Sequence, residues 1–188
     1  LRAAGLPDEY PHDVSYRTTT LGEEIARIHI PGRNTRLTDH SGPDGNWPTP
    51  EPPHRINQRY IEPIFRRHVQ KQTLITCLYR HQVLAFTQDK NQVTAQIQNL
   101  DQPDSQALTL SAAYMVGCDG GRSMVRKGIG AKLVGDEVVQ RVQSTCIRAP
   151  HLIEHMKAPP AWAMFTVNPR RSGNIYAIDG KEVWLIHN

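Results

Sequence analysis

Apolar residues recur along this chain with two different spacings. Between Ile56 and Gln70 they return every three or four positions and form one stripe, which predicts an amphipathic helix with Asn57 as its N-cap. Elsewhere they alternate with polar residues, most cleanly from Gln92 to Gln98, and such alternation predicts strands with one face in water. The predicted strands cover residues 14–20, 24–30, 73–77, 81–87, 92–98, 107–110, 141–148, 162–167, 174–178 and 182–187.

Two segments depart from these patterns. Residues 41–54 hold five prolines and two glycines, a density that predicts an extended loop or lid rather than a regular element. Residues 113–117 are almost wholly apolar, which predicts a strand covered on both faces, and a glycine turn and a helix start at Ser123 follow. Strand, turn and helix in this order are typical of an α/β crossover. The predicted fold class is therefore α+β, an α/β portion joined to a mostly antiparallel sheet.

Composition excludes several classes of protein. The chain has 188 residues and a net charge of only +4 with no basic run, so we expect no nucleic acid as a partner. It holds no apolar run of about 18 residues, which predicts no membrane span. The three cysteines are widely spaced, which favours a reducing, cytoplasmic location over a disulfide framework.

The turn after residues 113–117 has residue types suited to binding a nucleotide cofactor. Gly120 and Gly121 allow a sharp turn and a close approach of the backbone to a ligand. The following helix would present free N–H groups to an anion, and Asp119 could accept a hydrogen bond from a ribose hydroxyl. Arg122 and Arg126, four positions apart, would add positive charge on one helix face. The alternative is an ordinary turn in which Asp119 caps the helix.

A family resemblance favours the cofactor interpretation. The run Val116-Gly-Cys-Asp-Gly-Gly-Arg-Ser-Met-Val-Arg126 resembles the DG motif of the FAD-dependent aromatic hydroxylases, the flavin monooxygenases of the p-hydroxybenzoate and phenol hydroxylase type. The run Arg55-Ile-Asn-Gln-Arg-Tyr-Ile-Glu-Pro-Ile-Phe-Arg66 resembles the helix that precedes this motif in the family, with Gln58 and the Glu62-Pro63 pair in place. That likeness accounts for Pro63, which the helical pattern alone leaves as a conflict.

The resemblance implies a reaction and a set of site residues. Such enzymes use NAD(P)H to reduce FAD and then use O₂ to hydroxylate a small, phenol-like aromatic substrate. The last third of the chain would supply the wall of the substrate pocket, although each aromatic side chain there could instead fill the core of the sheet. No catalytic residue is assigned. By similarity, the cofactor-binding residues are Gln58, Asp119, Gly120, Arg122 and Arg126, and the pocket residues are Trp162, Phe165, Tyr176 and Trp184.

The resemblance also implies a division of the chain. Residues 1–55 would be a hairpin and proline-rich loop of the substrate domain, residues 56–130 the helix, β-meander and DG strand-turn-helix of the FAD-binding domain, and residues 131–188 a truncated portion of the substrate-binding sheet. The family's G-x-G-x-x-G and later G-D-A-x-H-type segments are absent from these residues. We therefore expect the central piece of a longer enzyme, with the rest of the parent chain as its partner and weak FAD binding by this piece alone. The sequence does not decide whether the protein forms a homodimer.

Two other functions compete with this interpretation. The run His151-Leu-Ile-Glu154-His155 matches the H-x-x-E-H pattern of zinc metallopeptidases, in which the two histidines bind zinc and the glutamate is the general base. Neighbouring prolines leave room for barely two helical turns, and only Asp179 and Glu182 could supply a third ligand nearby, so we expect no metal site. The second alternative is a non-catalytic domain that binds a substrate or a protein partner.

Overall fold

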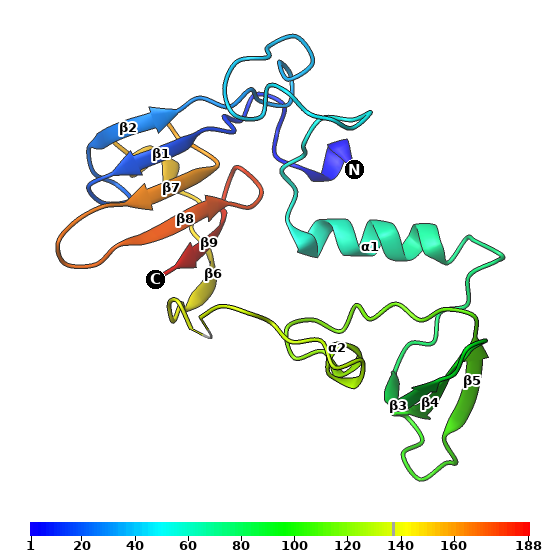
Figure 1. Cartoon of the computed structure of the whole chain (residues 1–188). Helices are drawn as coiled ribbons and strands as arrows, with labels where there is room; N and C mark the ends of the chain where they lie inside the picture. The colour runs from blue at the N-terminus through cyan, green and yellow to red at the C-terminus, as the bar shows by residue number, and fades with distance from the viewer. Residues whose placement is uncertain (137) are drawn as a thin grey trace. The chain divides into compact units, whose positions relative to one another are not determined.

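The chain forms two compact units in the computed structural model, which describes residues 1–136 and 138–188. Unit 1 combines residues 1–71 with residues 140–188, and unit 2 consists of residues 72–139, the green part of the chain in Figure 1. Short strands outnumber helices in both units. The chain is α+β, as its hydrophobic pattern predicts.

Unit 1 is built on one six-stranded sheet with the order β2-β1-β7-β8-β9-β6. Neighbouring strands are antiparallel except for β1 and β7, which run parallel. The sheet brings together strands from the first 30 and the last 45 residues, and each begins and ends inside a predicted strand segment except β8, which begins one residue earlier. The bounds are Val14–Arg17 (β1), Glu24–Ile28 (β2), Ser144–Arg148 (β6), Ala163–Thr166 (β7), Gly173–Ala177 (β8) and Val183–His187 (β9).

The core of unit 1 lies against one face of this sheet. Trp184 in β9 is fully buried there, and its indole N–H donates to the carbonyl of Ala149 at 3.2 Å. The N-terminal segment covers the same face, because Leu6 and Tyr10 pack into this core. Unit 1 also contains two short 3₁₀ turns, Arg2–Ala4 and Ile153–His155.

A buried ionic network fastens the β1–β2 hairpin. Arg17 is fully buried, and its guanidinium donates to Ser15 Oγ at 2.9 Å and to the carbonyl of Pro159 at 2.5 Å. Arg27 on β2 pairs with Asp13 at 2.8 Å and with Glu24 at 2.7 Å. Because guanidinium groups saturate the carbonyl and carboxylate oxygens here, the network tolerates burial.

The helix α1, Gln58–Val69, confirms the helical prediction. Asn57 caps it by accepting a hydrogen bond from the backbone N–H of Arg59 at 3.1 Å. The helix continues through Pro63, which removes one backbone donor without ending the element. No helix among the described residues has the length and apolar character needed to cross a membrane.

Unit 2 contains a three-stranded antiparallel meander and a short helix. The strands are β3, His81–Gln88, β4, Val93–Asn99, and β5, Leu108–Ala112, in that order across the sheet. The helix α2, Met124–Gly128, begins after Ser123, as predicted. Its end packs closely on the meander, since a side-chain carbon at Gly128 would lie 2.6 Å from the ring of Phe86.

Two strand predictions are wrong. Residues 73–77 and 113–117 form no strand. In the second segment Tyr114 is 89% and Val116 82% exposed, so the apolar run is not covered on both sides as its composition predicted. An extended run becomes a strand only where a neighbouring strand takes its backbone hydrogen bonds, and within the described residues no strand pairs with either segment.

Candidate functional site

A row of aromatic side chains runs along the face of the unit 1 sheet opposite Trp184 and ends at Trp162, which precedes β7 and also packs against the core. Its members are Tyr16, Phe165, Tyr176 and Trp162. Tyr16 stacks on Phe165 with centroids 5.5 Å apart, and Phe165 meets the edge of Tyr176 at 6.5 Å. Tyr176 in turn lies 5.3 Å from Trp162. Cross-strand pairing produces this row, because Tyr16 is opposite Phe165 in the register and Tyr176 is opposite Ala163, two positions from Phe165.

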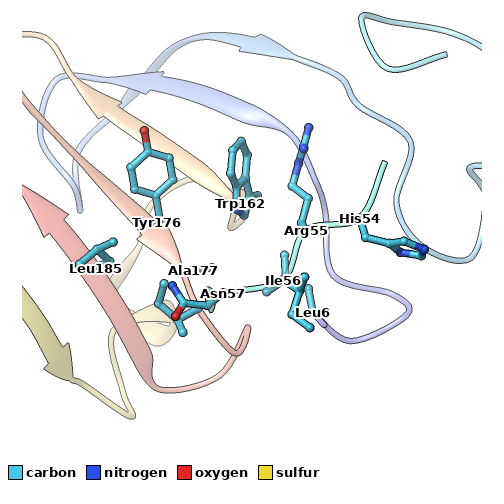
Figure 2. A pocket seen from close by; sticks show the side chains of 10 residues that line it. Leu6, His54, Arg55, Ile56, Asn57, Trp162, Tyr176, Ala177 and Leu185 are labelled. Carbon is cyan, nitrogen blue, oxygen red and sulfur yellow. The ribbon is translucent and has the colours of Figure 1, made fainter. Parts of the chain in front are cut away.

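The first of two cavities beside the row lies at its Trp162 end, where core residues such as Leu6 and Ala177 also line it. It has a volume of about 240 Å³, and Trp162, Tyr176 and Leu185 form its apolar wall. Arg55 stacks on Trp162 with its guanidinium carbon 4.1 Å from the ring centroid, and Figure 2 shows the indole between Arg55 and Tyr176. The cavity therefore combines aromatic faces with one cation.

The second cavity lies at the other end of the row and has a volume of about 280 Å³. Tyr16, Phe165, Asn174 and His187 are among the residues that line it. The side-chain oxygen Oδ1 of Asn174 is buried without a hydrogen-bond partner. A buried acceptor in this state favours a ligand that donates a hydrogen bond.

Three of the four predicted pocket residues thus lie together, and the fourth does not. Trp162, Phe165 and Tyr176 belong to the aromatic row, whereas Trp184 is fully buried within the core. Successive strand residues point to opposite faces, and Trp184 is paired with Ala177 while Leu185 is paired with Tyr176. Trp184 therefore supports the sheet from behind.

The DG turn of unit 2 is ordered by Asp119. One carboxylate oxygen accepts from the Ser123 hydroxyl at 2.5 Å, and the other accepts from the backbone N–H groups of Met124 at 2.6 Å and Val125 at 3.2 Å. The hydrogen bond from Ser123 is the main cause that lowers the pKa of Asp119. The prediction that the helix presents free N–H groups to an anion is wrong for these two, because Asp119 takes them. A carboxylate has about four acceptor positions, so one remains for a further donor such as a hydroxyl.

The other predicted cofactor residues occupy different settings. Arg122 precedes α2 and so does not share a helix face with Arg126; with Asp119 it lines a cavity of about 490 Å³ within unit 2. Arg126 folds back, and its guanidinium donates to the carbonyl of Gly121 at 2.9 Å. Gly120 adopts a φ of +75°, which favours glycine, and open space surrounds it. Gln58 belongs to unit 1, where its amide donates to the carboxylate of Glu62.

The residues of the metallopeptidase pattern do not form a metal site. Only Ile153–His155 forms a 3₁₀ turn, so His151 lies outside it, and the Nδ1 atom of His151 pairs with the carboxylate of Glu154 at 3.2 Å. Across the described part of the chain, no group of three metal-ligating side chains comes together. The zinc alternative is not favoured.

Sequence reasoning missed several residues of unit 1. Tyr16, Asn174 and His187 join the aromatic face through strand pairing. The alternation within each strand could have assigned each residue to a face of its strand, but it could not show that the three residues lie next to one another. Arg55 was read only as part of a motif. The cluster of His12 and Arg36 had no sequence signal, because the two residues are 24 positions apart and meet through loops.

Comparisons with known proteins identify the family. Residues 2–186 match the family described as FAD binding domain. The FAD-dependent monooxygenase opdD of Penicillium oxalicum is 25% identical across 100% of this chain, and the alignment covers 37% of that protein. Phenol 2-monooxygenase of Pseudomonas sp. (strain EST1001) is 31% identical across 70% of this chain and 20% of its own length.

A solved structure shows the same fold. The flavin-dependent monooxygenase PieE, determined in complex with FAD and substrate, aligns with 100% of this chain and 32% of its own, with a TM-score of 0.81 and 22% identity. The chain thus spans about a third of opdD and of PieE. It belongs to the FAD binding domain family and is related to the FAD-dependent aromatic hydroxylases that its DG motif resembles.

Proposed function

We propose that the chain is part of an FAD-dependent monooxygenase that hydroxylates a phenol-like aromatic compound with NAD(P)H and O₂. The observation that carries the proposal is the aromatic row with a cavity at each end, in a chain of this family. Aromatic faces bind aromatic rings by offset or edge contacts, and substrate cavities are largely apolar with a few polar groups. Trp162, Phe165 and Tyr176 would form the pocket wall.

The DG turn has the properties that binding of FAD requires. Gly120 and Gly121 have no heavy atom within 4 Å of the position of an added side-chain carbon, so a ligand can approach the backbone closely. Asp119, Gly120 and Arg122 would hold the ribose and pyrophosphate, with Gln58 and Arg126 as further contacts. When bound, the reduced flavin supplies the activation of O₂, and the protein contributes position and shielding.

The residues of the sheet would bind and orient the substrate. The aromatic row would fix the plane of the ring, and rotation of the Asn174 side chain would bring its unpaired Oδ1 to a phenol hydroxyl in the second cavity. A buried acceptor without this donor costs free energy, so the site prefers a phenol to an unsubstituted ring. The aromatic row and Asn174 would therefore bind and orient the ring, and neither is assigned a catalytic role.

Unit 2 would pack against further polypeptide. Its large apolar side chains Leu74, Tyr114 and Val134 are 98%, 89% and 100% exposed, which is more than a unit of this size normally leaves to water. The rest of a parent chain is the proposed partner, and residues 1–188 alone would bind FAD weakly. The three cysteines are free, which supports a reducing, cytoplasmic location.

The test is to express the reading frame that encodes this chain and to measure bound flavin and NAD(P)H oxidation across a panel of phenols. We expect bound FAD, oxidation stimulated by at least one phenol, and a hydroxylated product identified by chromatography. A non-catalytic binding domain would bind phenols without oxidising NAD(P)H. The absence of both bound flavin and phenol-stimulated NAD(P)H oxidation would contradict the proposal.

A further inference from the structure

A histidine lies between two carboxylates just after β2. Nδ1 of His29 is 3.2 Å from Oδ1 of Asp13, and Nε2 of the same ring is 3.5 Å from Oδ2 of Asp39. Asp13 immediately precedes β1, whereas Asp39 belongs to the long loop between β2 and α1 (Figure 1). The ring therefore connects the sheet of unit 1 to this loop.

Two carboxylates on one imidazole ring require that the ring be charged. A neutral imidazole has one N–H group and one lone pair, so it attracts one carboxylate and turns a lone pair toward the other. A protonated imidazole has an N–H group on each nitrogen and attracts both. The proton on His29 therefore decides whether both contacts hold.

The two contacts differ in what else supports them. Asp13 is buried, pairs with Arg27 at 2.8 Å and accepts from the backbone N–H of Ile30 at 3.0 Å. Within the described part of the chain, His29 is the only cationic group that pairs with Asp39. Loss of the ring proton therefore releases Asp39 and leaves Asp13 in place.

The carboxylates around His29 stay charged over the range in which histidine titrates. The hydrogen bond from Ser41 is the main cause that lowers the pKa of Asp39. Glu24, the other carboxylate on Arg27, also has a lowered pKa, with the hydrogen bond from Arg27 as the main cause. Between about pH 5 and pH 8 the change of charge therefore comes from the ring.

The loop that contains Asp39 also reaches the first cavity. Five residues after Asp39, the carboxylate of Asp44 pairs with Arg55 at 2.5 Å. Arg55 stacks on Trp162 in the wall of that cavity, with its guanidinium carbon 4.1 Å from the ring centroid. Any change in how Asp39 is held thus acts on the segment that positions Arg55.

We propose that His29, Asp13 and Asp39 form a proton-dependent clasp that holds the loop of residues 32–45 on the sheet. With the ring protonated, His29 binds both carboxylates and the clasp is closed. With the ring neutral, Asp39 is released and the loop opens around it. The stability of the closed clasp is present below the titration of His29 and is lost as the pH rises through it.

Hydrogen exchange of the loop amides tests the clasp. The backbone N–H groups of Thr38 and Asp39 donate to the carbonyl of Thr35, and that of Ser41 donates to the Asp39 carboxylate. Their protection is measured at about pH 5.5 and about pH 8, relative to the unstructured exchange rate at the same pH. We expect protection about threefold higher at the lower pH, the size expected of a partly exposed ion pair. Equal protection at both pH values would overturn the proposal.

Two variants identify the carboxylate that is responsible. Asp39→Asn removes the charge but keeps an oxygen that can accept from the N–H of Ser41. Asp8→Asn is the matched control, because Asp8 pairs with Arg33, which does not titrate in this range. We expect the pH difference to disappear in Asp39→Asn and to persist in Asp8→Asn. A difference that persists in Asp39→Asn would overturn the assignment.

Two other histidines must be separated from His29. Burial is the main cause that lowers the pKa of His12 to about 4, so this ring stays neutral over the measured range. His40 lies in the loop itself, where Nδ1 is 2.9 Å from the carbonyl of Gly45. His40→Asn replaces this ring by a group that does not titrate, and the pH difference should persist. Its loss would assign the effect to His40 and overturn the proposal.

A measurement on the unsubstituted protein completes the test. The ring C–H resonances of His29 give the pH midpoint of its titration by NMR, and the protection of the loop amides should change at the same midpoint. Two separate midpoints would overturn the clasp. None of these readouts depends on flavin or turnover, so the clasp can fail while the proposed hydroxylase holds, and the reverse.

Discussion

Unit 1 buries many of its apolar residues, whereas unit 2 leaves its large apolar residues exposed. Every hydrophobic residue that is buried in the described structure belongs to unit 1. There the sheet, the N-terminal segment and residues 149–156 enclose a shared core. In unit 2 Ser123 is buried, while Leu74, Tyr114 and Val134 are almost fully exposed. The strands of both units follow alternation equally well, so a correct local pattern does not ensure that a unit can cover its own apolar surface.

The comparison also separates two kinds of polar contact. Unit 1 buries Arg17, His12 and Arg36, and each depends on neighbours from distant parts of the chain. Unit 2 relies on exposed, local contacts such as those of Asp119 with the turn that follows it. We therefore expect substitutions in unit 1 to change stability strongly and matched substitutions in unit 2 to change it little.

The largest effect is expected for Trp184→Ala. The side chain is fully buried, and its removal should lower the free energy of unfolding by about 4 kcal/mol through lost burial and a cavity. Tyr114→Ala, at an exposed position of unit 2, should cost less than about 0.5 kcal/mol. Denaturant unfolding followed by far-UV circular dichroism reports on both units, and tryptophan fluorescence separates unit 1, which holds all three tryptophans. An equal loss of unfolding free energy in both variants would contradict the expected difference between the two units.

Arg17→Met should have the next largest effect. It removes the fully buried guanidinium that donates to Ser15 Oγ and to the carbonyls of Thr20 and Pro159, at an expected cost of about 3 kcal/mol. Arg80→Met in unit 2 breaks an exposed ion pair with Asp101 of 2.8 Å and should cost less than about 1 kcal/mol. Thermal unfolding of the two variants checks the contrast. A loss in Arg80→Met as large as that in Arg17→Met would contradict it.

Acid should destabilise unit 1 through His12. Its pKa is lowered from 6.5 to about 4 by burial and by the charges of Arg36 and Arg55. As pH falls below about 6.5, the unfolded chain takes up the proton first, so stability present above this pH is lost as the pH falls toward 4. The expected loss is about 3 kcal/mol between pH 7 and pH 4.

His12→Asn provides the control for that pH dependence. The amide oxygen can still accept from Arg36 but does not titrate, so its unfolding free energy should vary less over the same range. His54 contributes to the remaining slope, because burial and the charges of Arg36 and Arg2 lower its pKa too. Identical pH profiles of the two proteins would show that His12 is not the group responsible.

The smallest effect is expected at the glycine turn of unit 2. Gly120→Ala forces a side chain into a φ of +75° and should cost about 1 kcal/mol, whereas Gly121→Ala, with equal space and no positive φ, should cost almost nothing. Hydrogen exchange of the α2 amides measures this difference locally. Equal protection in both variants would show that the backbone relaxes.

The sequence by itself determined the elements whose signals are local. The apolar stripe with Asn57 gave α1, alternation gave the strands of both sheets, and glycines with Ser123 gave the turn and α2. The same reasoning was wrong for residues 113–117, because a continuous apolar run says only that a covering surface is needed. It does not say whether that surface exists within the unit.

Only the tertiary structure decided what the elements place together. Trp184 and Tyr176 have the same composition signal, yet the register between β8 and β9 sends one into the core and the other into the aromatic row. Loop packing brings His12 to Arg36, and the path of residues 54–57 brings Arg55 to Trp162. The physical reason is that pairing between distant strands sets which face a residue occupies, whereas a residue's own neighbours in sequence set only whether it alternates.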